Sequence, residues 1–207
     1  MQPASTELLI IFTKNPQLGK VKTRLAKDIG EEAALEIYKF LLLHTFQITL
    51  DLPVDKRVYY SEAIPEEDIW KKDIFQKKLQ HGEDLGEKMQ NAFAEGYKDG
   101  YQNIIIIGSD LYELSAEDLS EAFADLQQKD FVVGPAKDGG YYLLGMKQLR
   151  PEIFSNKKWS TSTVLPDTLK DLQNENLKLL AVRNDVDTFE DIREQEAFQQ
   201  FLPKNNQ

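Results

Sequence analysis

Short apolar runs alternate with longer amphipathic segments along this 207-residue chain, and this alternation limits its possible folds most strongly. The clearest runs are residues 8–13 (LLIIFT) and 103–108 (NIIIIG), which are followed by polar or glycine-containing turns. A continuous apolar run of this length predicts a strand that is buried on both faces. Strands that alternate with helices favour a mostly parallel sheet with helices on both sides. We therefore expect a three-layer α/β/α fold.

The remaining elements follow the same alternation. Strands are predicted at residues 8–13, 56–61, 75–80, 103–108, 131–135, 141–146 and 178–182. Helices are predicted at residues 31–50, at 85–98, after the serine cap of segment 115–118, after segment 160–163, and at 188–201. No repeat or flexible linker divides the chain. The sequence therefore predicts one domain over residues 1–207, with its core at about 7–202.

Composition excludes several classes of function. The chain has 25 Lys and Arg against 35 Asp and Glu, a formal net charge of −10, and no cysteine. This balance disfavours a nucleic-acid partner, and a disulfide or thiolate metal site is impossible. No secretory signal pattern opens the chain, and its longest uncharged apolar stretch, residues 40–50, is too short for a membrane span. We expect a cytoplasmic protein whose oligomeric state is open, with a homodimer as one option.

Basic residues gather in the loop that follows the first predicted strand. Residues 14–27 contain no acid and five basic residues, namely Lys14, Lys20, Lys22, Arg24 and Lys27. Gly19 lets the backbone approach a ligand closely, and a helix that begins after this loop would favour an anion at its start. The pattern favours a polyphosphate site, although the spacing is not that of a P-loop. A solvated basic loop is the alternative.

Two acidic segments follow predicted strands or precede predicted helices. Asp110 ends the Gly-Ser-Asp segment after the strand at 103–108, and Asp187 lies in the segment 185–188 (DVDT). Carboxylates of this kind hold Mg²⁺ or Mn²⁺, often together with substrate phosphates. We predict Asp110 and Asp187 as metal ligands. The alternatives are a turn cap at Asp110 and an ordinary helix N-terminal acid at Asp187.

Three further segments are candidates for substrate contacts. Asp138 and the bare backbone of Gly139 and Gly140 can approach a substrate hydroxyl, although Asp-Gly also favours a simple hairpin, and both can hold. Gln80 can hydrogen-bond the edge of a base. Trp159 and the adjacent hydroxyls can line an acceptor pocket, with ordinary packing of Trp159 as the alternative.

Six motifs occur in a characteristic order along the chain. They are Phe12-Thr-Lys14-x-Pro16 with Gly19-Lys-Val-Lys-Thr-Arg-Leu25, Gln80-x-Gly-x-Asp-Leu-Gly86, Gly108-Ser-Asp110, Gly134-Pro-x-x-Asp-Gly-Gly-Tyr-Tyr142, Trp159-Ser-Thr161 and Asp185-Val-Asp-Thr188. Taken together, they resemble the bacterial glycosyltransferase family DUF2064, which is related to nucleotide-diphospho-sugar transferases of the GT-A fold. The resemblance runs from about residue 8 to residue 192. It departs at Tyr112, where the family usually has proline.

The resemblance implies a role for each matching segment. Residues 14–24 would cradle the nucleotide, with Lys22 and Arg24 near its phosphates, and Gln80 and Gly86 would hold the base. Asp110 and Asp187 would hold Mg²⁺ or Mn²⁺. The sugar or acceptor would contact the remaining candidates, which are Asp138, Gly139, Gly140, Tyr141, Trp159 and Ser160.

The implied reaction is metal-dependent transfer of a sugar from a nucleotide-diphospho-sugar to an acceptor of unknown identity. Asp110 would act through the metal, and Asp138 would serve as a base or would position the acceptor. Transfer of a nucleotidyl group from an NTP, with release of pyrophosphate, is the first alternative. A nucleotide-binding protein without catalytic activity is the second.

Overall fold

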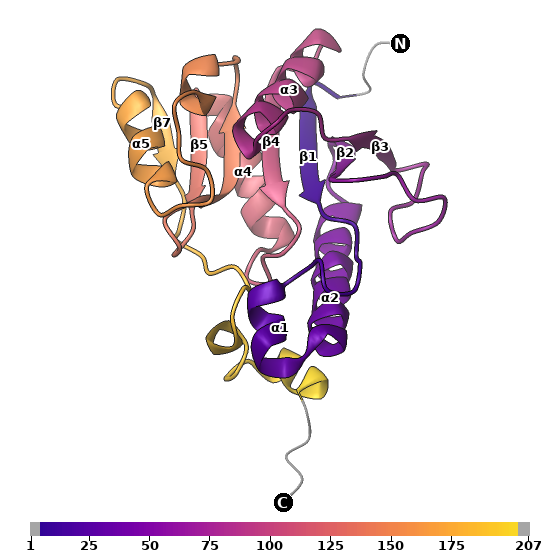
Figure 1. Ribbon diagram of the computed structural model, residues 1–207. Helices are drawn as coiled ribbons and strands as arrows, with labels where there is room; N and C mark the ends of the chain where they lie inside the picture. The colour runs from indigo at the N-terminus through magenta and orange to yellow at the C-terminus, as the bar shows by residue number, and fades with distance from the viewer. Residues whose placement is uncertain (1–4, 203–207) are drawn as a thin grey trace, which may run out of the picture.

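The computed structural model describes residues 5–202 of the chain. Its centre is a seven-stranded sheet with the strand order β3-β2-β1-β4-β6-β5-β7 (Figure 1). The strands are β1 (Glu7–Thr13), β2 (Asp55–Tyr60), β3 (Phe75–Leu79), β4 (Asn103–Gly108), β5 (Phe131–Pro135), β6 (Tyr141–Met146) and β7 (Leu177–Leu179). Only β6 runs against its neighbours, since it pairs antiparallel with both β4 and β5. The predicted mostly parallel sheet is confirmed.

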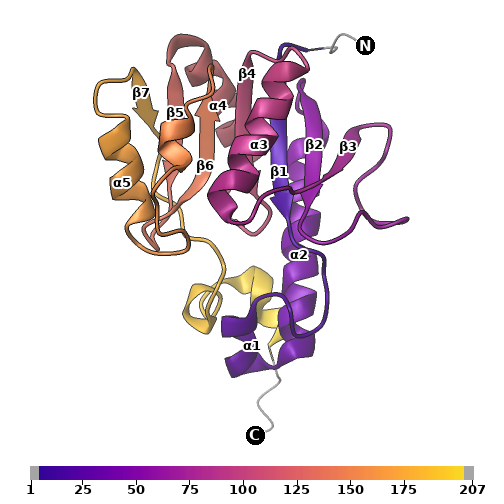
Figure 2. The same ribbon diagram turned by 45° about the horizontal axis from the view of Figure 1, so that its top comes forward.

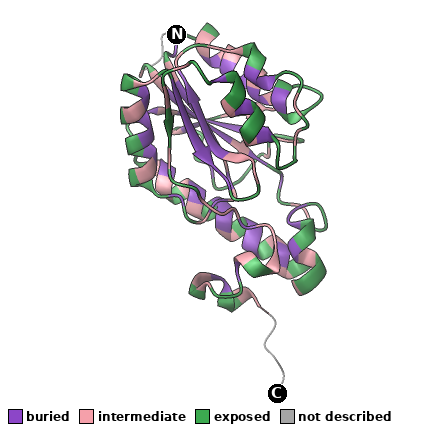
Figure 3. Cartoon of the chain, turned by 90° about the vertical axis from the view of Figure 1, so that its left-hand side faces the viewer, coloured by how far each residue is buried: buried purple, intermediate pink, exposed green. Residues whose placement is uncertain are grey.

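Strands β1 and β4 lie side by side within the sheet and are buried on both faces, and Figure 3 shows buried strands at the centre of the sheet. Their side chains alternate between two apolar clusters. Leu9 and Ile105 belong to the cluster under α2 and α4, whereas Leu8 and Ile104 belong to the cluster under α3. This arrangement explains why both runs are apolar at consecutive positions and do not alternate with polar residues.

Helices cover both faces of the sheet. They are α1 (Thr23–Ile29), α2 (Glu31–Leu50), α3 (Leu85–Lys98), α4 (Ala116–Gln128) and α5 (Val164–Asp171), and a 3₁₀ helix spans Pro151–Phe154. Figure 2 shows α3 crossing in front of β1 and β4. The predicted serine cap of α4 is confirmed, because the Ser115 hydroxyl accepts the Asp118 N–H and the Asp118 carboxylate accepts the Ser115 N–H. No helix in residues 5–202 is long and apolar enough to cross a membrane.

The predicted helix at residues 188–201 is wrong. Two short 3₁₀ helices, Phe189–Asp191 and Glu196–Phe201, occupy this segment. The Thr188 capping signal is real, since its side chain and that of Asp191 form a capping box. Side-chain amides then occupy backbone carbonyls that an α-helix would need: Gln195 Nε2 donates to Asp191 O at 2.6 Å.

Two smaller differences from the predicted elements concern β7 and helix α1. The strand predicted at residues 178–182 is shorter and covers Leu177–Leu179. Helix α1 was not predicted, and it begins directly after Lys22 in the basic segment. Its Leu25 joins Ile37 of α2 and Val186, Ile192 and Phe198 of the C-terminal segment in a third apolar cluster. This cluster holds the C-terminal segment beside α1 and α2 (Figure 1).

Gly96 allows α3 to approach the sheet closely. A Cβ atom there would lie 2.6 Å from Ile104 Cδ1 and 3.0 Å from Leu8 Cδ2, and both side chains are fully buried. Although Gly is a poor helix former, we expect Gly96→Val to lower the free energy of unfolding by about 1–3 kcal/mol because it overpacks this contact. Urea denaturation checks this. Ala124→Val, at an exposed site on α4, should cost less than about 1 kcal/mol; equal losses would contradict the packing argument.

Candidate functional site

A cavity of about 490 Å³ opens at the carboxyl ends of β1 and β4. Ligand sites in parallel α/β sheets form at this edge, where loops diverge from neighbouring strands. Six segments supply its walls: the loop after β1 with the start of α1, the start of α3, the loop after β4, the β5–β6 turn, the segment around residue 160 and the segment around residue 186. The polar lining includes Lys14, Arg24, Asp110, Asp138, Ser160, Thr161, Asp185 and Asp187.

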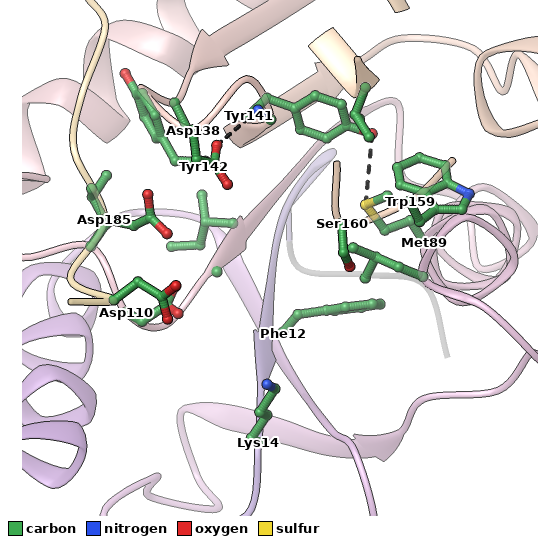
Figure 4. A pocket seen from close by; sticks show the side chains of 18 of the residues that line it. Phe12, Lys14, Met89, Asp110, Asp138, Tyr141, Tyr142, Trp159, Ser160 and Asp185 are labelled. Carbon is green, nitrogen blue, oxygen red and sulfur yellow. Dashed lines mark hydrogen bonds between the residues drawn. The ribbon is translucent and has the colours of Figure 1, made fainter. Parts of the chain in front are cut away.

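Acidic side chains line one side of this cavity (Figure 4). Asp110 follows β4, Asp138 lies in the β5–β6 turn, and Asp185 precedes the first 3₁₀ helix of the C-terminal segment. The Gly140 N–H donates to Asp138 Oδ1 at 2.8 Å and thereby orients that carboxylate. Burial, together with the charges of Asp110 and Asp138, raises the pKa of Asp185 to about 6. The negative charges of Asp110 and Asp138 therefore both act on Asp185 across the shared space.

Sequence reasoning did not assign Asp185 to the site. In this segment Asp187 alone is predicted as a ligand, although both residues line the cavity. The signal was present in the spacing, because residues two apart in an extended segment point to the same side. Val186 between them points away and is buried in the third apolar cluster. Its N–H donates to Asp110 O at 3.3 Å, which joins this segment to the loop after β4.

Lys22 and Asp110 form a largely buried ion pair. The Nζ–Oδ2 distance is 2.9 Å, and the Lys22 side chain is 5% exposed whereas that of Asp110 is 43% exposed. Burial alone would raise the pKa of Asp110, but the Lys22 ammonium outweighs it and holds this pKa below its usual value. Burial likewise opposes the charge on Lys22, yet Asp110 raises the pKa of Lys22 above its usual value. Both groups are therefore charged at neutral pH.

Lys22 also has an unusual backbone conformation. Its φ of 48° and ψ of 42° lie in the left-handed region, which non-glycine residues rarely adopt. This conformation comes directly before α1 and turns the chain so that the side chain enters the protein while Arg24 faces the cavity. Arg24 Nη1 reaches Asp187 Oδ2 at 2.8 Å, in a pair that is 71% and 37% exposed. The predicted phosphate-binding Lys22 is thus already occupied by a carboxylate.

The donor set of the cavity fits a hard divalent cation. Asp110, Asp185 and Asp187 offer only carboxylate oxygens, which Mg²⁺ and Mn²⁺ prefer. Burial and the charges of Asp110 and Asp138 raise the pKa of Asp185, and a bound cation would favour its charged form. These side chains do not form a ready-made cage, because no cluster of three metal-ligating residues is assembled among residues 5–202. A cation would also compete with Arg24 for Asp187.

An apolar wall faces the carboxylates (Figure 4). It consists of Phe12 from β1, Met89 from α3, Tyr141 from β6 and Trp159 from the loop before α5. The Trp159 indole packs directly on Gly86, where a Cβ atom would lie 2.4 Å from its Nε1. Ser160 beside it has a left-handed backbone with φ of 62°. The cavity therefore combines a charged side with a flat apolar side suited to a ring.

Other predicted residues do not face the cavity directly. Gln80 Nε2 donates to Tyr59 O at 3.0 Å and Thr13 O at 3.3 Å, which secures the ends of β1 and β2. Lys20 pairs with Glu62 at 3.3 Å outside the cavity lining. Gly86 supports Trp159, and Gly139, with φ of 90°, packs against the Ser162 backbone. Gly19 lies against the Glu31 carboxylate with φ of 72°.

The two ion pairs should differ in strength because they differ in burial. In a double-mutant cycle, we expect Lys22→Met and Asp110→Asn to show a coupling of about 1–3 kcal/mol at pH 7. Since the folded pKa of Asp110 is depressed, this stabilisation should persist above about pH 4 and disappear only as pH falls through the lower folded value. Urea denaturation over a pH series measures it.

The exposed pair provides the matched cycle. Arg24→Met and Asp187→Asn should show a coupling below about 1 kcal/mol at every pH, since solvent and salt screen this contact. A coupling at least as large in the exposed pair would contradict the assignment of Lys22–Asp110 as the structural ion pair of the site.

Comparisons with known proteins agree with this architecture. A protein from Desulfovibrio desulfuricans G20, provisionally assigned as a nucleotide-diphospho-sugar transferase, is 31% identical, with a TM-score of 0.83 over 89% of this chain and 83% of that one. Rv0371c from Mycobacterium tuberculosis H37Rv, in complex with manganese, is 14% identical, with a TM-score of 0.58 over 91% and 97% of the two chains.

A third solved structure shows the same fold at lower identity. The 4-diphosphocytidyl-2C-methyl-D-erythritol synthase of Anaerococcus prevotii DSM 20548 is 12% identical, with a TM-score of 0.59 over 94% and 97% of the two chains. No curated protein matches the chain. The model of the family described as "Uncharacterized protein conserved in bacteria (DUF2064)" matches residues 45–161, more than half of the sequence. The chain therefore belongs to the DUF2064 family.

Proposed function

We propose that this protein is a metal-dependent glycosyltransferase that uses a nucleotide-diphospho-sugar donor. One observation carries the proposal: four carboxylates and only two basic side chains line a single cavity at the carboxyl edge of the sheet. Such a cavity repels a diphosphate unless a cation accompanies it. The D. desulfuricans relative, provisionally assigned as a nucleotide-diphospho-sugar transferase, supports the class of donor.

Each side of the cavity would have a separate task. Asp110 and Asp187 would hold Mg²⁺ or Mn²⁺, with Asp185 beside them, and the bound ion would supply positive charge to the diphosphate. Lys14 and Arg24 would contact phosphate oxygens and stabilise the charge that develops as the nucleoside diphosphate leaves. Arg24 is suited to this because its pair with Asp187 is exposed and weak.

The opposite side would hold the sugar and the acceptor. The rings of Tyr141 and Trp159 offer flat apolar faces to a sugar or a base. Asp138 is exposed and held by the Gly140 N–H, so it can receive an acceptor hydroxyl. That hydroxyl would attack the anomeric carbon as the bond to the diphosphate breaks, and Asp138 would take its proton or fix its position.

Nucleotidyl transfer is the second candidate. In that reaction a phosphorylated acceptor would attack the α-phosphate of an NTP, and pyrophosphate would leave. The A. prevotii relative is a 4-diphosphocytidyl-2C-methyl-D-erythritol synthase, and another structural relative is a CMP-2-keto-3-deoxy-manno-octonic acid synthetase complexed with CTP. The same carboxylates and cations would serve both reactions.

Binding should depend on both the nucleotide and the metal. We expect nucleotide-diphospho-sugars to raise the melting temperature with Mn²⁺ present and to have little effect with EDTA, because the acidic lining otherwise repels the diphosphate. Asp187→Asn and Lys14→Met should each weaken binding about tenfold or more in a titration. Lys98→Met removes an exposed charge at the far end of α3 and should leave binding unchanged. Equal binding with EDTA would contradict metal dependence.

Product analysis separates the two reactions. Incubation with nucleotide-diphospho-sugars and with NTPs, each with Mn²⁺ and an extract of candidate acceptors, should release nucleoside diphosphate from the former. Release of pyrophosphate from an NTP would favour nucleotidyl transfer instead. Metal-dependent binding of both ligand classes without any turnover would identify a nucleotide-binding protein that is not an enzyme.

A further inference from the structure

The phenol hydroxyl of Tyr38 lies directly beneath the loop that follows β1. Strand β1 ends at Thr13, so Lys14 is the first residue without a strand partner. The Lys14 N–H donates to Tyr38 Oη at 2.9 Å, and Tyr38 Oη donates to Lys14 O at 3.1 Å. One hydroxyl on α2 therefore satisfies both backbone groups of Lys14, where pairing within the sheet ends.

The same hydroxyl reaches the loop that follows β4. Tyr38 Oη lies 3.4 Å from Ser109 Oγ and 3.2 Å from Thr13 Oγ1, and Ser109 Oγ donates to Thr13 Oγ1 at 3.1 Å. All three residues are no more than 4% exposed. The three hydroxyl oxygens lie within 3.4 Å of one another, and we call these residues the Tyr38 triad: Tyr38, Thr13 and Ser109.

The hydrogens in this triad can all be used. If Tyr38 gives its proton to Lys14 O, its two lone pairs accept the Lys14 N–H and one neighbouring hydroxyl. Thr13 donates to Tyr38 and accepts from Ser109. The Thr13 hydroxyl can also donate to Lys14 O at 3.3 Å, so the network stays satisfied when its hydrogens are exchanged. A satisfied buried network of this kind holds its members together, because separating them would leave buried polar groups without partners.

Thr13 and Ser109 immediately precede two residues of the cavity, and Tyr38 hydrogen-bonds the backbone of one of them, Lys14. Lys14 follows Thr13 and Asp110 follows Ser109, and both side chains line the cavity. Neither Thr13, Ser109 nor Tyr38 is among the residues that line it. Their hydroxyls are therefore placed to act on the position of Lys14 and Asp110, and not on a ligand.

We propose that Tyr38 is a positioning residue that fixes the loops carrying Lys14 and Asp110 relative to each other. The importance of this for ligand binding rests on the proposed function, whereas the positioning itself does not. In this role Tyr38, on the buried face of α2, sets the distance between Lys14, which would contact phosphate, and Asp110, which would hold the metal. Mispositioning of such groups weakens ligand binding even when their chemistry is intact.

Tyr38→Phe removes the hydroxyl and keeps the buried ring. Tyr97→Phe is the matched control, because Tyr97 Oη donates to Met146 O at 2.7 Å at the end of β6, away from the cavity. Amide hydrogen exchange by NMR measures positioning without any ligand. We expect exchange at Lys14 to accelerate at least tenfold in Tyr38→Phe and to stay unchanged in Tyr97→Phe. Unchanged exchange at Lys14 in Tyr38→Phe would overturn the proposal.

A second measurement connects positioning with binding. With Mn²⁺ present, Tyr38→Phe should bind a nucleotide-diphospho-sugar at least tenfold more weakly, and Tyr97→Phe should match the wild type even if both lose similar thermal stability. Thr13→Val should weaken binding as Tyr38→Phe does, and Thr13→Ser, which keeps the hydroxyl, should restore it. Full affinity in Tyr38→Phe would overturn the role in binding. Absence of binding by the wild type would refute the proposed function, while hydrogen exchange would still decide the positioning.

Discussion

The parallel pairing of β1 and β4 is the constraint on which the site depends. Both strands are buried on both faces, so neither can slip by one residue without moving apolar side chains between clusters that already fill different layers. Their register places Phe12 opposite Gly108 at the carboxyl edge. The loops that follow β1 and β4 therefore leave the sheet side by side, and the side chains of Lys14 and Asp110 line the same cavity. A hydroxyl from α2 then joins the loops where sheet hydrogen bonds stop.

Elements that depend on residues close together in the sequence could be predicted. Examples are the apolar runs of β1 and β4 and the serine cap of α4, because each is formed by a few consecutive residues. Helix α1 was missed because it has only seven residues, and its stability depends on packing of Leu25 against α2 and the C-terminal segment. The C-terminal 3₁₀ helices depend on side-chain contacts such as Gln195 to Asp191, which no periodicity reveals.

The candidate site shows the same division. Its location followed from strand ends, and the segments containing Asp110, Asp138 and Trp159 do line one cavity. What each side chain touches could not be read from the sequence, because it depends on residues far apart in the chain. Lys22 finds Asp110 across 88 positions, and Gln80 is used to hold the backbone of β1 and β2. Nothing in the sequence singles out Tyr38, because its hydroxyl partners are Thr13 at the end of β1 and Ser109 in the loop after β4.

The lining of the cavity is mainly acidic, although the basic segment 14–27 led us to predict a phosphate site there. Of the five basic residues in segment 14–27, Lys14 and Arg24 line the cavity, Lys22 is buried against Asp110, and Lys20 pairs with Glu62 elsewhere. Four carboxylates share the lining with those two cations.

The site is thus acidic, like the chain as a whole. The basic residues of segment 14–27 alone do not make the cavity attractive to phosphate. Partial protonation of Asp185, whose pKa is raised to about 6, reduces this repulsion only modestly at neutral pH. Lys22 already pairs with Asp110 and Arg24 with Asp187. A divalent cation that binds both carboxylate and phosphate oxygens would offset the remaining negative charge of the lining and would free Arg24 for the diphosphate. The proposed metal dependence of nucleotide binding would therefore follow from the charge balance in the cavity.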